Sequence, residues 1–410
     1  MQSSSLTAPA ATGAKWLSVV GIGEDGVAGL GAAARDAIGA AEVVFGGARH
    51  LELARPLVAG EARAWPTPFD AGAVEALRGR RVCVLASGDP FHHGVGATLA
   101  RRIDPGEMDV FPGASAFGLA AARLGWALHE VEAISLHGRS EARLRPLLHP
   151  GARIIALTSD GAAPARIAGR LAGIGFGGSR LHVLEAMGGK RERHRTATAA
   201  GFGDVACAAL NVLAIEVVAD REAAVLPLGG LDDDLFEHDG QITKREIRVV
   251  ALAALAPRRG ELLWDVGAGS GSIAIEWMLR HPTLRAVAVE ARADRAARIR
   301  RNAEALGAPG LDVREGVAPA AFADLPRPDA IFIGGGADSG VLDAAIGALP
   351  AGGRLVANAV TLATQALLTA AADRLGGSLV MLSVARASPV GGMTAWRPAM
   401  PVVVWSWVKP

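Results

Sequence analysis

Residues 262–276 read LLWDVGAGSGSIAIE, and this stretch decides the fold of the second half of the chain. A mostly apolar run leads into Gly267, Gly269 and Gly271, after which the spacing of apolar residues is typical of a helix. A strand, a glycine turn and a helix in this order let backbone N–H groups approach a bound ligand. The stretch therefore predicts an α/β domain that binds a nucleotide.

An acidic residue stands about twenty residues beyond the glycines, where nucleotide-binding folds place one. It is Glu290, which closes a second apolar run at 286–289. A carboxylate at the end of a second strand can accept hydrogen bonds from a ribose diol. Two other interpretations stay open. One is a glycine turn without a ligand, and the other is a nicotinamide-dependent oxidoreductase, although dinucleotide folds favour the spacing G-x-G-x-x-G.

Five more strands are predicted after Glu290, at residues 311–314, 330–334, 354–358, 380–384 and 402–408. Seven strands, together with alternating glycines preceded by Asp265, resemble the class I methyltransferases, which bind S-adenosyl-L-methionine (SAM). This resemblance implies a Rossmann-like fold in which the glycine loop passes beneath the cofactor and Glu290 holds its ribose. The cofactor contacts that it implies in this half are Gly267, Ala268, Gly269, Ser270, Gly271, Glu290 and Ala318.

Residues 242–248, ITKREIR, predict a helix just before the first of these strands. Thr243 and Glu246 have the spacing of a capping box, so Thr243 is the expected N-cap. A helix in this position could also cover the methionine end of the cofactor, which adds Thr243 to the candidate cofactor contacts. Three glycines at 334–336 follow the fourth strand and indicate either a tight turn or room for a flat, bulky acceptor.

The first half predicts strands that end in glycine-containing loops. The strands are expected at 16–23, 42–46, 82–86, 109–111, 132–136, 153–157, 180–185 and 212–218, with helices at 29–40 and 163–172. Ligands of open parallel sheets bind beyond the carboxyl ends of the strands. The loops after the third and fourth strands, which contain Gly88 and Ser115, are therefore candidate ligand loops.

Five motifs in this half resemble the tetrapyrrole methylase family. They are GIG at 21–23, ASGDPFHHG at 86–94, PGASAF at 112–117, ISLHGR at 134–139 and LEAMGGKRER at 184–193. The family usually carries a proline in the first motif, where this chain reads Glu24, Asp25 and Gly26. The resemblance implies two α/β lobes split near residue 112. The cofactor contacts that it implies are Gly88, Asp89, Pro90, Ser115 and Thr158, although helix capping is an equally good interpretation of Asp89.

These patterns divide the chain into four segments. They are a disordered tail at 1–14, a tetrapyrrole methylase domain at 15–220, a solvated linker at 221–240 and a class I methyltransferase domain at 241–410. Pro227, two glycines and the acidic run 232–234 are the signals for the linker. A length of 410 residues suits two or three domains. The pairing of the two folds resembles the fused methyltransferases of cobalamin biosynthesis.

This last resemblance implies two methylations of a precorrin, a corrin-precursor tetrapyrrole, at C5 and C15, with decarboxylation of the ring C acetate. The first half would methylate C5, and the second would methylate C15 and decarboxylate, with one SAM per domain. Methyl transfer to an electron-rich carbon requires alignment in a dry site, so no catalytic triad is expected and the catalytic residues stay unassigned. A SAM methyltransferase for RNA or another small molecule, with a first half that only binds ligand, is an alternative.

A precorrin carries several carboxylates, which arginine binds in bidentate fashion. The candidate substrate residues at the expected sheet edges are His137, Arg139, Arg245, Gly335 and Arg386. A solvated surface position is the competing interpretation of each arginine. His92, His93 and His137 invite a metal hypothesis. Neighbours on a helix point apart, however, and no Cys or acid completes a set, so no metal is predicted.

Charge and cysteine content limit which partners and which cellular compartment are expected for this chain. Lys and Arg total 42 against 41 Asp and Glu, a net charge of +1, so no overall field attracts nucleic acid or a membrane. No apolar stretch is long enough to span a bilayer. Cys83 and Cys207 lie in apolar runs and are expected to be core thiols in a reducing compartment, which indicates the cytoplasm. Both families commonly self-associate, so a homo-oligomer is expected by analogy.

Overall fold

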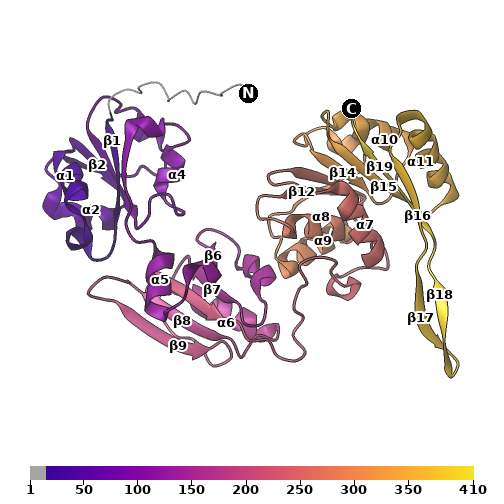
Figure 1. Ribbon diagram of the computed structural model, residues 1–410, viewed down its shortest axis with the longest axis horizontal. Helices are drawn as coiled ribbons and strands as arrows, with labels where there is room; N and C mark the ends of the chain where they lie inside the picture. Colours follow the sequence, from indigo (N-terminus) through magenta and orange to yellow (C-terminus); the bar gives the residue numbers. More distant parts are fainter. Residues whose placement is uncertain (1–14) are drawn as a thin grey trace, which may run out of the picture. The chain divides into compact units, whose positions relative to one another are not determined.

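The computed structural model describes residues 15–410, and the tail predicted for residues 1–14 lies outside them. Contacts divide the chain into two units (Figure 1). The N-terminal unit contains the chain up to Arg139 together with Pro150–Ala224, and the C-terminal unit contains Ser140–His149 and Val225–Pro410. In residues 15–410 no helix has both the length and the apolar character needed to cross a membrane.

The first sheet of the N-terminal unit is parallel and five-stranded, in the order β3-β2-β4-β1-β5. Its strands are β1 Leu17–Ile22, β2 Val43–Gly46, β3 Glu61–Ala64, β4 Val82–Ser87 and β5 Met108–Phe111. The central strands β1 and β4 are nearly continuous apolar runs because helices cover both faces of a parallel sheet. Those helices are α1 Ala32–Ala40, α2 Ala48–Ala54, α3 Gly72–Glu75 and α4 Val95–Leu99.

The second sheet of this unit is mixed, in the order β6-β7-β10-β8-β9. Its strands are β6 Val131–Ser135, β7 Arg153–Leu157, β8 Arg180–Glu185, β9 Arg193–Thr198 and β10 Asn211–Glu216, and its helices are α5 Ala116–Leu124 and α6 Ala163–Gly173. The α5 residue Phe117 packs against Ile155 and Leu184 of this sheet, in line with a split of the two lobes near residue 112. The edge strands β3 and β9 were not predicted, because both are polar and largely exposed.

The C-terminal unit contains a seven-stranded sheet in the order β13-β12-β11-β14-β15-β19-β16, so the predicted strand count is confirmed. The strands are β11 Leu262–Val266, β12 Arg285–Glu290, β13 Asp312–Glu315, β14 Ala330–Ile333, β15 Arg354–Ala359, β16 Ser378–Leu382 and β19 Val402–Val408. Only β19 runs antiparallel to its neighbours. This Rossmann-like arrangement confirms the predicted fold class of the second half.

Helices cover both faces of this sheet (Figure 1). They are α7 Arg245–Leu255, α8 Ser272–Leu279, α9 Ala293–Leu306, α10 Ser339–Ala348 and α11 Leu362–Leu375. Alternate strand residues face opposite sides, as the strand period requires. Leu263 and Phe332 belong to the core under α7, α8 and α9, whereas Trp264 and Ile331 belong to the core under α10 and α11.

A hairpin between β16 and β19 leaves the seven-stranded sheet and extends into solvent (Figure 1). Its strands are β17 Ala385–Val390 and β18 Met393–Pro398, joined at Gly391 and Gly392. The prediction missed it, although two glycines between two short runs are a hairpin signal. Its side chains are mostly exposed, including the apolar Met393 and Trp396.

The segment predicted as a solvated linker, 221–240, is largely exposed but is not solvated throughout. Leu226, Leu231 and Phe236 are buried in the core of the C-terminal unit. The prediction rested on the glycines and aspartates of this segment. It gave no weight to the apolar residues between them, which pack into the core. The predicted N-cap is also wrong, because Lys244 occupies the N-cap position of α7 and no side chain caps the helix.

Candidate functional site

The glycine loop of the C-terminal unit lies at the carboxyl end of β11, as predicted. Gly267, Gly269 and Gly271 have φ angles of +68°, +61° and +76°, a region that other residues rarely adopt. A Cβ on Gly267 would lie 2.5 Å from the carbonyl oxygen of Gly335, and one on Gly271 would lie 2.7 Å from Cγ2 of Ile299. The loop therefore needs glycine both for its backbone angles and for close contact with the 334–336 loop and α9.

Glu290 lies directly beside this loop. Its carboxylate is buried, and it accepts hydrogen bonds from the amides of Gly269 at 2.9 Å and Arg292 at 3.1 Å. A carboxylate has about four acceptor positions, so capacity for a diol remains after these two bonds. The geometry fits the predicted role of Glu290 in holding a ribose next to the glycine loop.

Asp265, just before the loop, is fully buried and accepts a hydrogen bond from the amide of Ala274 at 3.0 Å. This bond joins the end of β11 to the first turn of α8. Burial, with a smaller contribution from the charge of Glu290, raises the pKa of Asp265 to about 7. Asp265 thus accepts from an amide of α8, whereas the carboxylate of Glu290 accepts from an amide of the glycine loop.

The other predicted residues of this half lie in other segments of the unit. Ala318 is half-buried after β13 and packs against the core under α10 and α11, and Gly335 faces open space. The backbone carbonyl of Thr243 accepts a hydrogen bond from Nη1 of Arg248 at 2.6 Å. Arg245 pairs with Asp232 at 2.5 Å and Arg386 pairs with Glu246, so both arginines already have acidic partners.

Three loops of the N-terminal unit meet through their backbones at the carboxyl edge of the first sheet. The amide of Gly88 donates to the carbonyl of Ile22 at 3.2 Å, and the amide of Gly113 donates to the carbonyl of Gly88 at 3.1 Å. A Cβ on Gly21 would lie 1.7 Å from the carbonyl oxygen of Gly88. The loops after β1, β4 and β5 therefore form one continuous surface, and Gly21 and Gly88 are required for their contact.

The polar residues predicted in these loops have structural partners. Asp89 accepts from the amide of Phe91 at 2.8 Å, which shapes a turn, whereas the N-cap of α4 is Gly94. The helix-capping alternative for Asp89 is therefore wrong. Pro90 lies in the same turn, and its carbonyl accepts from the amide of Gly96 at 2.9 Å.

Two more predicted contacts are hydroxyls that already make hydrogen bonds. Ser115 caps α5 by accepting from the amide of Gly118 at 3.0 Å. Thr158 is buried and donates to Oδ1 of Asn211 at 2.7 Å. Their roles as cofactor contacts stay predictions. The two substrate candidates of this unit, His137 and Arg139, are exposed just after β6.

The sequence did not reveal a polar cluster at the end of β4. Ser87 Oγ accepts from Nη2 of Arg49 at 2.9 Å and lies 2.8 Å from Nε2 of His50, while Arg49 forms an ion pair with Glu24. Burial lowers the pKa of His50 to about 4, so this imidazole is neutral at pH 7. Glu24 lies in the turn that lacks the family's usual proline, which was the available signal, but its partners are too distant in sequence to be inferred.

Histidines and cysteines of the two units make no metal centre in the described part of the chain. Residues 15–410 contain no group of three or more His, Cys, Asp or Glu side chains that could hold a metal ion. His92 stacks on Phe117 with ring centroids 4.5 Å apart. Cys83 is buried, but Cys207 is only half-buried, so the expectation that both are core thiols is wrong for Cys207.

Two family models match the chain, one in each half. Residues 17–202 match the tetrapyrrole (corrin/porphyrin) methylases, and residues 234–409 match the precorrin methyltransferase domain. With the two folds and their glycine loops, these matches define a protein that fuses two methyltransferase domains. The resemblances seen in the sequence are thereby confirmed for both halves.

Similar proteins identify the family. The chain is 60% identical over 398 residues to a precorrin-6Y C(5,15)-methyltransferase [decarboxylating] of Sinorhizobium sp, covering 96% of both chains. It is 44% identical to the protein of the same name from Mycobacterium tuberculosis, over 95% of this chain and 99% of that one. A shorter relative, from Pyrobaculum calidifontis, is a probable cobalt-precorrin-6B C(15)-methyltransferase (decarboxylating), 34% identical over 43% of this chain and 93% of its own. The chain belongs to the precorrin-6Y C(5,15)-methyltransferase (decarboxylating) family of cobalamin biosynthesis.

Proposed function

We propose that the chain methylates precorrin-6Y at C5 with its N-terminal unit and at C15 with its C-terminal unit, which also removes the ring C acetate carboxyl as carbon dioxide. Family membership supports the overall reaction. A relative that spans less than half of this chain is named for C15 methylation and decarboxylation alone, which supports assigning these two steps to one unit. The nicotinamide oxidoreductase and RNA methyltransferase alternatives are set aside.

Each unit, in this proposal, holds its own SAM. The observation that carries the proposal for the C-terminal unit is the pairing of the Glu290 carboxylate with the amide of Gly269, because it sets a diol acceptor beside a glycine-lined surface. Thr243 and Ala318 are proposed as contacts to the two ends of the donor. In the N-terminal unit, the proposed contacts are Gly88, Asp89, Pro90, Ser115 and Thr158.

The chemistry needs orientation more than proton transfer. Bound SAM supplies an electrophilic methyl group on a sulfonium. The protein has to hold the acceptor carbon in line with that methyl group and keep water out. The exposed His137 and Arg139, and the paired Arg245 and Arg386, are proposed to bind substrate carboxylates. For the paired arginines this means exchanging Asp232 and Glu246 for a carboxylate of the substrate.

Two reciprocal variants test which unit carries out which step. Gly269→Arg should abolish C15 methylation and decarboxylation while C5 methylation persists, and Gly88→Arg should do the reverse. Products are separated by mass, with two methyl gains and one carboxyl loss for the complete reaction. Survival of all three steps in a folded Gly269→Arg variant would eliminate the assignment of C15 chemistry to the C-terminal glycine loop.

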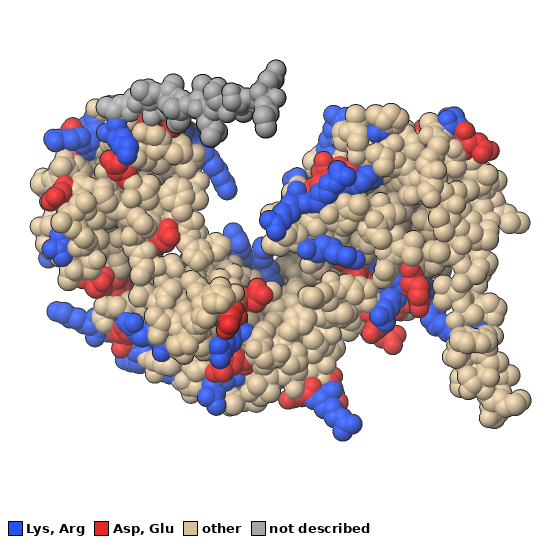
Figure 2. Space-filling view, in the orientation of Figure 1, with Lys and Arg blue, Asp and Glu red and all other residues tan. Residues whose placement is uncertain are grey.

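We also propose a cytoplasmic homo-oligomer. Val390, Met393 and Trp396 expose apolar surface on the β17–β18 hairpin, and Figure 2 shows few charged side chains there. An exposed apolar patch of this kind favours association. Replacing Met393 and Trp396 by lysine should lower the mass measured by light scattering, and an unchanged mass would exclude the hairpin as the contact. The free thiols of Cys83 and Cys207 are consistent with a reducing compartment.

A further inference from the structure

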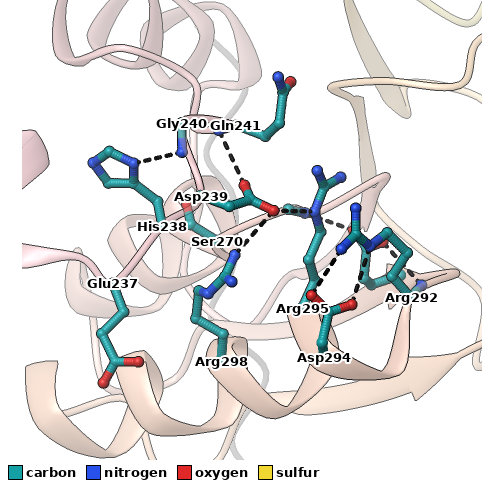
Figure 3. Close-up of polar contacts among 12 residues, drawn as sticks. Glu237, His238, Asp239, Gly240, Gln241, Ser270, Arg292, Asp294, Arg295 and Arg298 are labelled. Carbon is teal, nitrogen blue, oxygen red and sulfur yellow. Dashed lines mark hydrogen bonds and ion pairs between the residues drawn. The ribbon is translucent and has the colours of Figure 1, made fainter.

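A short segment before α7 lies against the glycine loop of the C-terminal unit. Residues 237–241 are called the strap here. The carbonyl oxygen of Gln241 lies 3.2 Å from the position that a Cβ on Gly269 would take. Figure 3 shows strap residues beside the start of α9, with contacts converging on Asp239. The strap therefore borders the surface on which the donor is proposed to bind.

One buried side chain joins the strap to the glycine loop. Asn302 of α9 is 2% exposed, and its Nδ2 donates to the carbonyls of Ser270 at 2.9 Å and Glu237 at 3.0 Å. Its Oδ1 accepts from the amide of Glu237 at 2.8 Å. Both N–H groups of the Asn302 side-chain amide therefore donate hydrogen bonds, one to the loop and one to the strap. Removal of Asn302 would break this link between the two segments.

Asp239 makes a second attachment between the strap and α9. Its carboxylate accepts from Nε of Arg295 at 2.9 Å, lies 3.3 Å from Nη1 of Arg298, and accepts from the amide of Gln241 at 3.1 Å (Figure 3). The hydrogen bond from Arg295 is the main cause that holds the pKa of Asp239 well below its ordinary value. Asp239 is therefore a carboxylate at neutral pH and holds Gln241 against the loop.

The loop residue beside this attachment has an unused polar group. Ser270 is buried, and its hydroxyl has no hydrogen-bond partner among the residues that the structure describes, while its carbonyl is held by Asn302. Because this hydroxyl makes no hydrogen bond there, the bond from Asn302 to the carbonyl is the side-chain contact that holds Ser270. The loop's geometry thus depends on contacts from α9.

We propose that Asn302 and Asp239 are positioning residues for the methyl donor of the C-terminal unit. They fix the strap against the glycine loop in the arrangement that binds SAM, and they do so without contributing to the chemical step. This inference rests on the proposed function, in which the C-terminal glycine loop binds SAM. It adds two residues and one segment that lie outside the family-derived set of cofactor contacts.

The test uses the full chain with Gly88→Arg, so that a titration with S-adenosylhomocysteine reports the C-terminal site. Because each lost hydrogen bond weakens binding severalfold, Asn302→Ala should lower the affinity about tenfold and Asp239→Asn about threefold or more. Asn302→Asp has the same shape but sets an oxygen against two carbonyls, so it should be at least as harmful as Ala. The KM for SAM in C15 methylation should rise more than kcat falls.

A matched control separates this role from a general effect on α9. Asp294 lies on the same helix, and its carboxylate pairs with Arg292 at 2.9 Å. Asp294→Asn should keep the wild-type affinity for S-adenosylhomocysteine. Folded Asn302→Ala and Asp239→Asn variants with wild-type affinity would overturn the inference. A folded Gly88→Arg parent that binds no S-adenosylhomocysteine would instead contradict the proposed function.

Discussion

Nε of Arg248 donates to Oε1 of Glu276 at 2.5 Å inside the C-terminal unit, where the two side chains are 0% and 1% exposed. The same guanidinium donates to the carbonyls of Thr243 and Leu231 and pairs with Asp233 at 3.0 Å. Glu276 also accepts from the amide of Leu231 at 3.1 Å. One buried ion pair therefore fastens the segment before α7 to both α7 and α8.

Arg248→Ala should destabilise the C-terminal unit strongly. Breaking a buried pair leaves Glu276 charged and uncompensated, which costs about 3–5 kcal/mol. The exposed pair of Arg374 with Asp343 provides the control, since Arg374→Ala should change stability by less than about 1 kcal/mol. Urea unfolding followed by circular dichroism measures both. Equal effects of the two variants would contradict the central role of the buried pair.

The burial and the partner of Arg248 were not predicted from the sequence. ITKREIR correctly predicted a helix, but it did not predict a buried arginine, and a solvated surface position was the competing interpretation of Arg245. Arg248 falls on the buried side of α7 beside Ile247 and Leu252, and its acid partner lies 28 residues away. A polar residue in a helix's apolar stripe was a usable signal. The identity of its partner depends on how α7 and α8 pack, which no local pattern contains.

Asp265→Asn should stabilise the protein increasingly as pH rises. The folded-state pKa of Asp265, about 7, lies above the ordinary value of 3.8, so the folded protein holds this proton more tightly than the unfolded chain. Wild-type stability therefore falls as pH rises through that window, whereas Asn has no proton to lose and can still accept from Ala274. The difference in unfolding free energy at about pH 8 should reach about 1–4 kcal/mol, because each tenfold change in proton affinity corresponds to about 1.4 kcal/mol.

Thermal unfolding midpoints measured from about pH 5 to about pH 8 would reveal this effect. Asp343→Asn serves as the control, because that carboxylate is exposed and paired only at the surface. A constant difference between Asp265→Asn and wild type across the range would show that Asp265 is not held in its protonated form by burial.

The two cysteines should differ in reactivity. Cys83 lies inside β4, and burial raises the pKa of its thiol to about 12, so almost no thiolate forms. Cys207 is half-buried in the loop before β10, and burial raises its pKa to a smaller extent. A thiol reagent at mildly alkaline pH should therefore label one cysteine in the folded protein and both in denaturant. Rapid labelling of Cys83 without unfolding would contradict the burial of β4.

The glycine loops illustrate which parts of the site were predictable. Gly267, Gly269 and Gly271 follow one another in the chain, so their strand–turn–helix pattern located the C-terminal loop directly. Asn302 and Asp239 contact that loop's surroundings from other segments, and their contacts form only when α9 packs beside β12. In the N-terminal unit the motifs located each loop, but the backbone contact between Gly21 and Gly88 depends on the strand order β4-β1-β5.

The close contact between Gly21 and Gly88 should be needed for C5 methylation. A methyl group on Gly21 would lie 1.7 Å from the carbonyl oxygen of Gly88, so Gly21→Ala must push apart the loops that carry the proposed donor contacts of the N-terminal unit. Displacements of about 1 Å can reduce rates roughly a hundredfold, so C5 methylation should fall by about that factor. C15 methylation and decarboxylation should stay near wild type, because the C-terminal glycine loop is unchanged.

Gly31→Ala is the matched control for this variant. Gly31 precedes α1 with a φ of −68°, and an added Cβ would meet no atom within 4 Å. This substitution should leave both methylations intact, as measured by the mass gains of the product. If Gly21→Ala and Gly31→Ala showed the same C5 rate, the junction of the β1 and β4 loops would have no part in C5 methylation, and the donor site of the N-terminal unit would have to lie elsewhere.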